Sequence, residues 1–201
     1  MAILKAQKKP RRPSLAVVDK IVLVAIVMLL GLMKPDLVVM TAYVLLYPYL
    51  FFTGRKKAFS HLLLATGLSL IWIVIGNSQY GYNQSMSHVF GFNLFPFFAW
   101  AIGLFASYIL YAHWEHVLKT KAWYKRLLFY LAIYWPLLIL LEWLAFHILM
   151  IRNVATGIYP GLPLCDCMHA PGWMKAVYLA LGPIYFSLCS LLGLENPHKK
   201  S

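Results

Sequence analysis

The stretch that decides the fold runs from Leu127 to Met150 and reads LLFYLAIYWPLLILLEWLAFHILM. It is apolar throughout apart from Glu142 and His147, and about 20 such residues suffice to cross the hydrocarbon core of a membrane. A carboxylate inside the run costs roughly 3 kcal/mol or more unless it is protonated or paired. The stretch therefore predicts a membrane-spanning helix, and Glu142 marks the place to look for function.

The whole chain has the composition of an integral membrane protein. Of its 201 residues 62% are hydrophobic and only 12% are charged, whereas about a quarter of a soluble domain is charged. The net charge of +12 does not indicate nucleic-acid binding, because the basic residues lie in short blocks between apolar runs. Such blocks are typical of cytosolic loops, and they favour the lipid bilayer and its anionic headgroups as partners.

Six apolar runs predict an all-α integral membrane protein, a bundle of six transmembrane helices with short loops and both termini cytosolic. Basic tails at residues 1–13 and 195–201 flank a transmembrane domain at 14–194. Pro35 separates the first two spans, because proline disfavours helix at the residue before it. One long helix through Pro35 is the alternative, but it would place two basic blocks on opposite sides. The spans are expected at residues 14–33, 36–52, 61–76, 90–111, 127–150 and 173–194.

The basic residues also predict the orientation. With six spans, fifteen Lys and Arg residues fall on the side of the termini, and only Lys34, Arg152 and Lys175 fall on the other. The positive-inside rule then places both termini in the cytosol, in a plasma or cytoplasmic membrane. No small-x-small cleavage site follows the first run, which we therefore interpret as an uncleaved signal anchor.

Glu142 is the expected catalytic acid or base. It lies 15 residues past the start of its span, about 22 Å along a helix that crosses roughly 30 Å of hydrocarbon, and thus in the outer half of the membrane. A neutral buried carboxylic acid can donate a proton. His147 is a second catalytic candidate, although about 140° of helix rotation separates it from Glu142. A structural role for Glu142, bonding a neighbouring helix, is the alternative.

Other residues at a similar depth are expected to bind the substrate. They are Asn77, Asn93, Trp143, Tyr178 and Arg152. Aromatic residues cluster at the outer ends of the third and fourth spans, where most should face lipid and a minority should line a groove for a flat apolar ligand. The cluster comprises Tyr80, Tyr82, Phe90, Phe92, Phe95, Phe97, Phe98 and Trp100.

Small residues in the fourth span predict close helix packing. Ala99, Gly103 and Ser107 are spaced four apart, so they share one helix face on which a neighbouring helix can approach closely.

The outer loop carries weak candidates for metal ligands. Cys165, Cys167 and His169 lie within five residues, and thiolates with imidazole suit copper(I) or zinc. Their spacing fits no common site, so we predict neither a metal nor a cofactor. A disulfide between the two cysteines is not expected, because residues one apart seldom meet the required geometry.

Three functions are compatible with these features. The first is an enzyme that acts on a lipid, isoprenoid or polyene by acid–base chemistry such as isomerisation, cyclisation or hydration; a quinone is a further ligand class. The main alternative is a noncatalytic subunit that binds a partner membrane subunit in a larger complex. A small transporter fits less well, because the cytosolic halves of the spans offer few polar groups.

Overall fold

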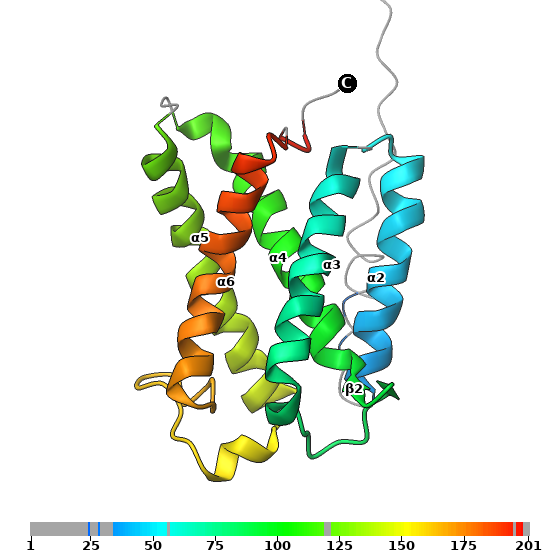
Figure 1. The fold of residues 1–201 in the computed structure, drawn as a ribbon, viewed down its shortest axis with the longest axis vertical. Helices are drawn as coiled ribbons and strands as arrows, with labels where there is room; N and C mark the ends of the chain where they lie inside the picture. The colour runs from blue at the N-terminus through cyan, green and yellow to red at the C-terminus, as the bar shows by residue number, and fades with distance from the viewer. Residues whose placement is uncertain are drawn as a thin grey trace, which may run out of the picture.

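The computed structural model describes residues 24, 28, 34–55, 57–118, 122–194 and 196–198. Within them, five helices are long and apolar enough to cross a membrane. The expected first span, residues 14–33, lies outside the described residues except for Val24 and Met28. The five helices are α2 (Pro35–Phe52), α3 (Lys57–Gly76), α4 (Leu94–Trp114), α5 (Trp123–Trp143) and α6 (Gly172–Leu191) (Figure 1).

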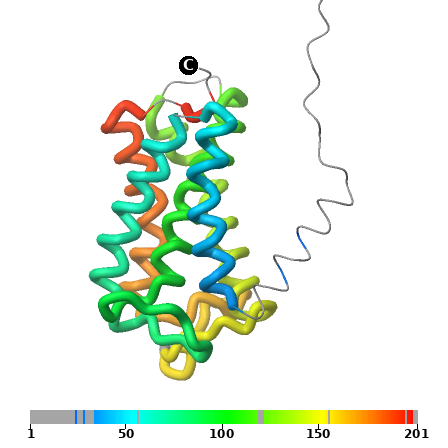
Figure 2. The backbone as a smooth tube through the Cα atoms, turned by 90° about the vertical axis from the view of Figure 1, so that its right-hand side faces the viewer, coloured from blue at the N-terminus to red at the C-terminus, as the bar shows by residue number. Residues whose placement is uncertain are grey.

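The helix α4 is the centre of the bundle, because it contacts each of the other four described helices. Around it, α2, α3, α6 and α5 pack in that order, each against the next. Among the described helices, α2 and α5 make no extensive contact with each other, so the ring around α4 is open between them. Figure 2 shows the elongated bundle, with the end of α6 at the end opposite to the start of α2.

Local sequence signals fix where two of the helices begin. Pro35 occupies the first turn of α2, where its missing N–H costs nothing. Asp36 follows it and accepts hydrogen bonds from the Ser87 backbone N–H at 2.9 Å and from its hydroxyl at 2.7 Å. Asn93 caps α4 by accepting the Phe95 N–H at 3.0 Å, so the helix begins at Leu94 rather than at residue 90 as expected.

The longer described segments outside the α-helices, residues 80–93 and 149–171, lie at the end of the bundle where α2 begins (Figure 1). The residues before α4 form the 3₁₀ turn Asn77–Gln79 and a two-stranded ribbon of β1 (His88–Val89) and β2 (Phe92–Asn93), which the sequence did not predict. After Trp143, α5 widens into the π-helical turn Leu144–Ile148. The expected fifth span is therefore not one regular helix to residue 150.

Several of the core tyrosines have hydroxyl groups that are paired with other helices. Tyr130 bonds the Ser107 hydroxyl at 2.9 Å, and Tyr185 donates to the His61 carbonyl at 2.8 Å. Pairing matters here because water is absent from the hydrocarbon core, and an unsatisfied polar group costs several kcal/mol there. Ser107 thus packs closely against α5, as its small size predicted. At Gly103, by contrast, an added Cβ would meet no atom within 4 Å, so no neighbouring helix packs closely on it among the described residues.

Candidate functional site

A pocket of about 570 Å³ lies in the opening between α2 and α5, a volume typical of small-molecule sites. The central helix α4 forms its floor with Ala99, Gly103 and Ala106. Side chains of α2 and α5 form its walls, and the loop before α6 contributes Met168 and His169 at one end. Apolar side chains make up most of this lining, so the pocket suits an apolar ligand.

Glu142 lies in the pocket wall, in the last turn of α5. Its side chain is half-buried, and among the described residues it has no hydrogen-bond or ion-pair partner. The described lining holds no Lys or Arg that could neutralise a carboxylate. An unpaired acid facing an apolar cavity is costly as a structural element, and intramembrane acids of this kind mark functional sites.

The hydroxyl group of Tyr80 links three other aromatic side chains beside the pocket by hydrogen bonds. Its hydroxyl oxygen accepts the indole N–H groups of Trp72 at 2.6 Å and Trp100 at 3.0 Å. An indole can only donate and a phenol oxygen has two lone pairs, so the two tryptophans fill both acceptor positions. The Tyr178 hydroxyl lies 3.0 Å from the same oxygen. Burial raises the pKa of Tyr80, so the phenol stays neutral at physiological pH.

Two more tyrosines complete the wall on either side of this cluster. Tyr134 of α5 donates to the Tyr178 carbonyl at 2.5 Å, which joins α5 to α6 beside the pocket. Tyr82 stacks on Tyr80 with ring centroids 6.3 Å apart. Burial, then Tyr80 and then Glu142 raise the pKa of Tyr82, so Glu142 lies within electrostatic reach of this ring.

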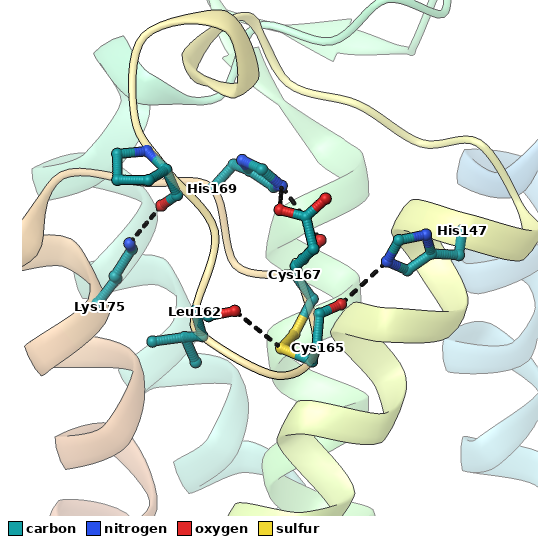
Figure 3. Close-up of a disulfide and its surroundings, with 8 residues drawn as sticks. His147, Leu162, Cys165, Cys167, His169 and Lys175 are labelled. Atoms are coloured by element: carbon teal, nitrogen blue, oxygen red, sulfur yellow. Dashed lines mark hydrogen bonds and ion pairs between the residues drawn. A yellow bond between two sulfur atoms is a disulfide. The ribbon is translucent and has the colours of Figure 1, made fainter.

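A disulfide between Cys165 and Cys167 shapes the loop at the end of the pocket, so the expectation of two unbonded cysteines is wrong (Figure 3). The two Cα atoms are 5.2 Å apart, within the usual range. This approach is reached because Leu164, Asp166 and Met168 adopt positive φ angles of 78°, 42° and 60°. The spacing of the two cysteines did not predict positive φ angles at every second residue of this loop, because non-glycine residues rarely adopt them.

The disulfide also bears on the weak metal candidates. Its sulfurs are bonded to each other, so in this state Cys165 and Cys167 supply no thiolate ligands. The nitrogens of His169 face the carbonyl oxygens of Tyr159 at 3.0 Å and Asp166 at 3.1 Å. A search of the described residues finds no group of three or more His, Cys, Asp or Glu side chains that could hold a metal.

Of the residues predicted from sequence, the structure brings Glu142 and Tyr178 to the same pocket. His147 lies on the π-helical turn and contacts the Cys165 carbonyl at 3.0 Å (Figure 3). Trp143 faces outward beside the ring of His147. The pocket lining includes neither of these side chains.

The other three predicted binding residues also lie outside the pocket lining. Asn77 donates to the Gly91 carbonyl at 3.2 Å, and Asn93 caps α4. The Arg152 guanidinium lies over the ring of Phe146, 5.1 Å from its centroid.

Tyr80, Trp100 and Tyr134 line the pocket but were not predicted as site residues, although the first two belong to the aromatic cluster at the outer ends of the third and fourth spans. Residue type alone could not separate those that face lipid from those that face the pocket. Phe90, from the same cluster, is 96% exposed, while Trp100 is buried. The missing signal was the hydroxyl–indole pairing, which joins residues far apart in the sequence.

Comparisons with models of known families, with curated proteins and with solved structures found no significant match to this chain.

Proposed function

We propose that this protein is a membrane-embedded enzyme in which Glu142 transfers a proton to and from a carbon–carbon double bond of an apolar substrate. The observation that carries the proposal is the unpartnered Glu142 carboxyl group in the wall of an apolar pocket. Every other acid in the described helices has a hydrogen-bond partner, since Asp36 bonds Ser87 and Glu115 bonds Arg126. Among the acids of the described helices, Glu142 is thus the one whose carboxyl group is not engaged in a hydrogen bond and can exchange a proton with a ligand.

The chemistry needs no further reactant. The Glu142 acid gives its proton to one carbon of the double bond, whose π electrons form the new C–H bond and leave a cation at the other carbon. The carboxylate then removes a proton from the next carbon, and the electrons of that C–H bond form the shifted double bond. The substrate is isomerised and Glu142 regains its proton.

The pocket walls suit the cationic intermediate. Aromatic faces attract a cation, most strongly when both are shielded from water. Trp100, Tyr134 and Phe146 all line the pocket together with Glu142. An apolar pocket also keeps water from trapping the cation, which favours proton loss over addition of a hydroxyl group.

Deuterium transfer tests this function before the natural substrate is known. Membranes containing the protein are incubated in D₂O with a neutral lipid extract of the host and, separately, with squalene. Once the Glu142 proton has exchanged with D₂O between turnovers, each turnover should place one deuteron on carbon, which mass spectrometry detects even when the isomers look alike. Glu142→Gln should lower incorporation by about a hundredfold or more, the usual scale of a lost acid–base group.

Two controls sharpen the result. Glu142→Asp retains an acid and should keep measurable incorporation. Asp166→Asn removes a carboxylate that is 73% exposed and outside the pocket lining, and it keeps an oxygen that can accept from His169 Nε2, which lies 3.3 Å away, so it should match the wild type. Undiminished incorporation in a stable Glu142→Gln protein would overturn the proposal and favour the noncatalytic subunit.

A further inference from the structure

The pocket lining extends along the helices α4 and α5. Its contacts on α4 run from Phe95 to Leu110, and those on α5 run from Tyr134 past Glu142 to the π-helical turn. Fifteen residues separate Phe95 from Leu110, and at 1.5 Å per residue they span about 22 Å. One leaflet supplies about 15 Å of hydrocarbon, half of the roughly 30 Å core. The groove is therefore longer than one leaflet is thick.

Small residues keep the middle of this groove open. Ala99, Gly103 and Ala106 recur at helical spacing on the face of α4 that forms the floor. A Cβ added at Gly103 would meet no atom within 4 Å. Among the described residues, the side chains that border this face belong to α2, α5 and Met28 and leave the pocket open, in contrast to Ser107, which packs on α5 through Tyr130. The floor thus leaves room for a long narrow ligand.

The described lining of the groove offers an anionic headgroup no Arg or Lys, and its imidazole, His169, already faces the carbonyl oxygens of Tyr159 and Asp166. Phosphate and carboxylate groups bind Arg and Lys, and the described lining contains neither. Arg152 lies over the ring of Phe146 and is not part of the pocket lining. Phospholipids and prenyl diphosphates therefore lack their usual partners in this pocket.

We propose that the groove binds a neutral, acyclic unsaturated hydrocarbon of the isoprenoid or polyene class, extended along α4 and crossing the membrane midplane. This inference rests on the proposed function for the position of the reacting double bond, which lies beside Glu142. The rest of the chain runs over Gly103 and Ala106 towards Leu110. Groove length then selects long chains over short ones.

Binding is tested with the purified protein in mild detergent. The probes are squalene, its shorter relative farnesene, and geranylgeranyl diphosphate as the charged chain. After gel filtration, the hydrocarbon bound per protein is extracted and measured by mass spectrometry. The wild type should retain squalene at about one per protein, and geranylgeranyl diphosphate at least tenfold less.

Two variants test the groove itself. Gly103→Leu and Ala106→Leu should each lower squalene retention about tenfold or more while leaving farnesene bound near Glu142. Gly67→Leu is the matched control, because Gly67 lies within α3, is exposed, and also has open space around its Cβ. Two independent variants are used so that misfolding of one does not decide the result.

Several outcomes would overturn the inference. They are equal squalene retention by Gly103→Leu, Ala106→Leu and wild type, preferential retention of the diphosphate or of phospholipid, or recovery of a partner protein instead of a hydrocarbon. The inference would also be overturned if the wild type did not bind squalene, which is the result expected if residues 14–33 occupy the groove. If squalene binds to wild type and Glu142→Gln alike but no deuterium is incorporated, the binding inference stands and the proposed catalysis fails.

Discussion

The indole N–H of Trp135 donates a hydrogen bond to the carbonyl oxygen of Leu179 at 3.1 Å, which joins α5 to α6. That carbonyl would normally accept the backbone N–H four residues on, which is position 183. Pro183 has no N–H, so the turn leaves the Leu179 carbonyl without its helical donor. Trp135 replaces the missing donor, so a proline within one helix is compensated by a side chain of its neighbour.

Trp135→Phe should lower the stability of the protein by about 1 kcal/mol, the scale of hydrogen bonds between helices in membranes. In a Pro183→Ala background the same substitution should cost clearly less, because residue 183 regains the N–H that the carbonyl needs. The measurement is thermal unfolding in detergent of the wild type, both single variants and the double variant. The four stabilities give the coupling energy between Trp135 and Pro183. Equal costs of Trp135→Phe in both backgrounds would show that the indole does not replace the proline's missing donor.

Gly182 should not tolerate a side chain. A Cβ there would overlap the ring of Tyr134, so Gly182→Ala must displace α6 or the tyrosine that lines the pocket. Overpacking of this kind costs about 1–3 kcal/mol. Gly172→Ala is the matched control, because it lies on the same helix with nothing within 4 Å of its Cβ. Detergent melts should show a loss for Gly182→Ala and little change for Gly172→Ala.

Apolar runs in the sequence were enough to predict a helical chain with several segments able to span a membrane, and five described helices meet that description. Pro35 and Asn93 also act locally, because a proline and an asparagine cap impose helix starts through their own backbone and side chain. These features are readable because they depend on neighbours within a few residues. The number of spans and the side of the termini remain predictions.

The candidate site was only partly predictable. Glu142 stands out in the sequence because hydrocarbon penalises any acid. The tyrosine cluster does not, because Tyr80 meets Trp100 and Tyr178 only after three segments pack together. Gly103 was expected to support a neighbouring helix, yet it faces the groove. Sequence spacing shows which residues share a helix face but not what covers that face.

The three cysteines should differ sharply in reactivity. In native protein that keeps the Cys165–Cys167 disulfide, maleimide should label no thiol, because Cys189 is fully buried. Mild reduction should expose two sites and detergent denaturation a third, which intact-mass spectrometry counts. Disulfides persist in oxidising compartments, which is compatible with the predicted non-cytosolic side of this loop. Two labels before reduction would contradict the disulfide.

Tyr80→Phe should be among the most damaging small changes in the pocket wall. It removes the oxygen that accepts both indole N–H groups, and Trp72 and Trp100 are too buried to turn to water. Leaving a buried donor unpaired costs about 1–3 kcal/mol, so the two together should cost about 2 kcal/mol or more. Tyr82→Phe removes a hydroxyl from the neighbouring ring that has no hydrogen-bond partner among the described residues, and should be nearly silent. Thermal melts of both variants, read with tryptophan fluorescence, separate the cases: equal stability would mean that Tyr80 contributes only its ring.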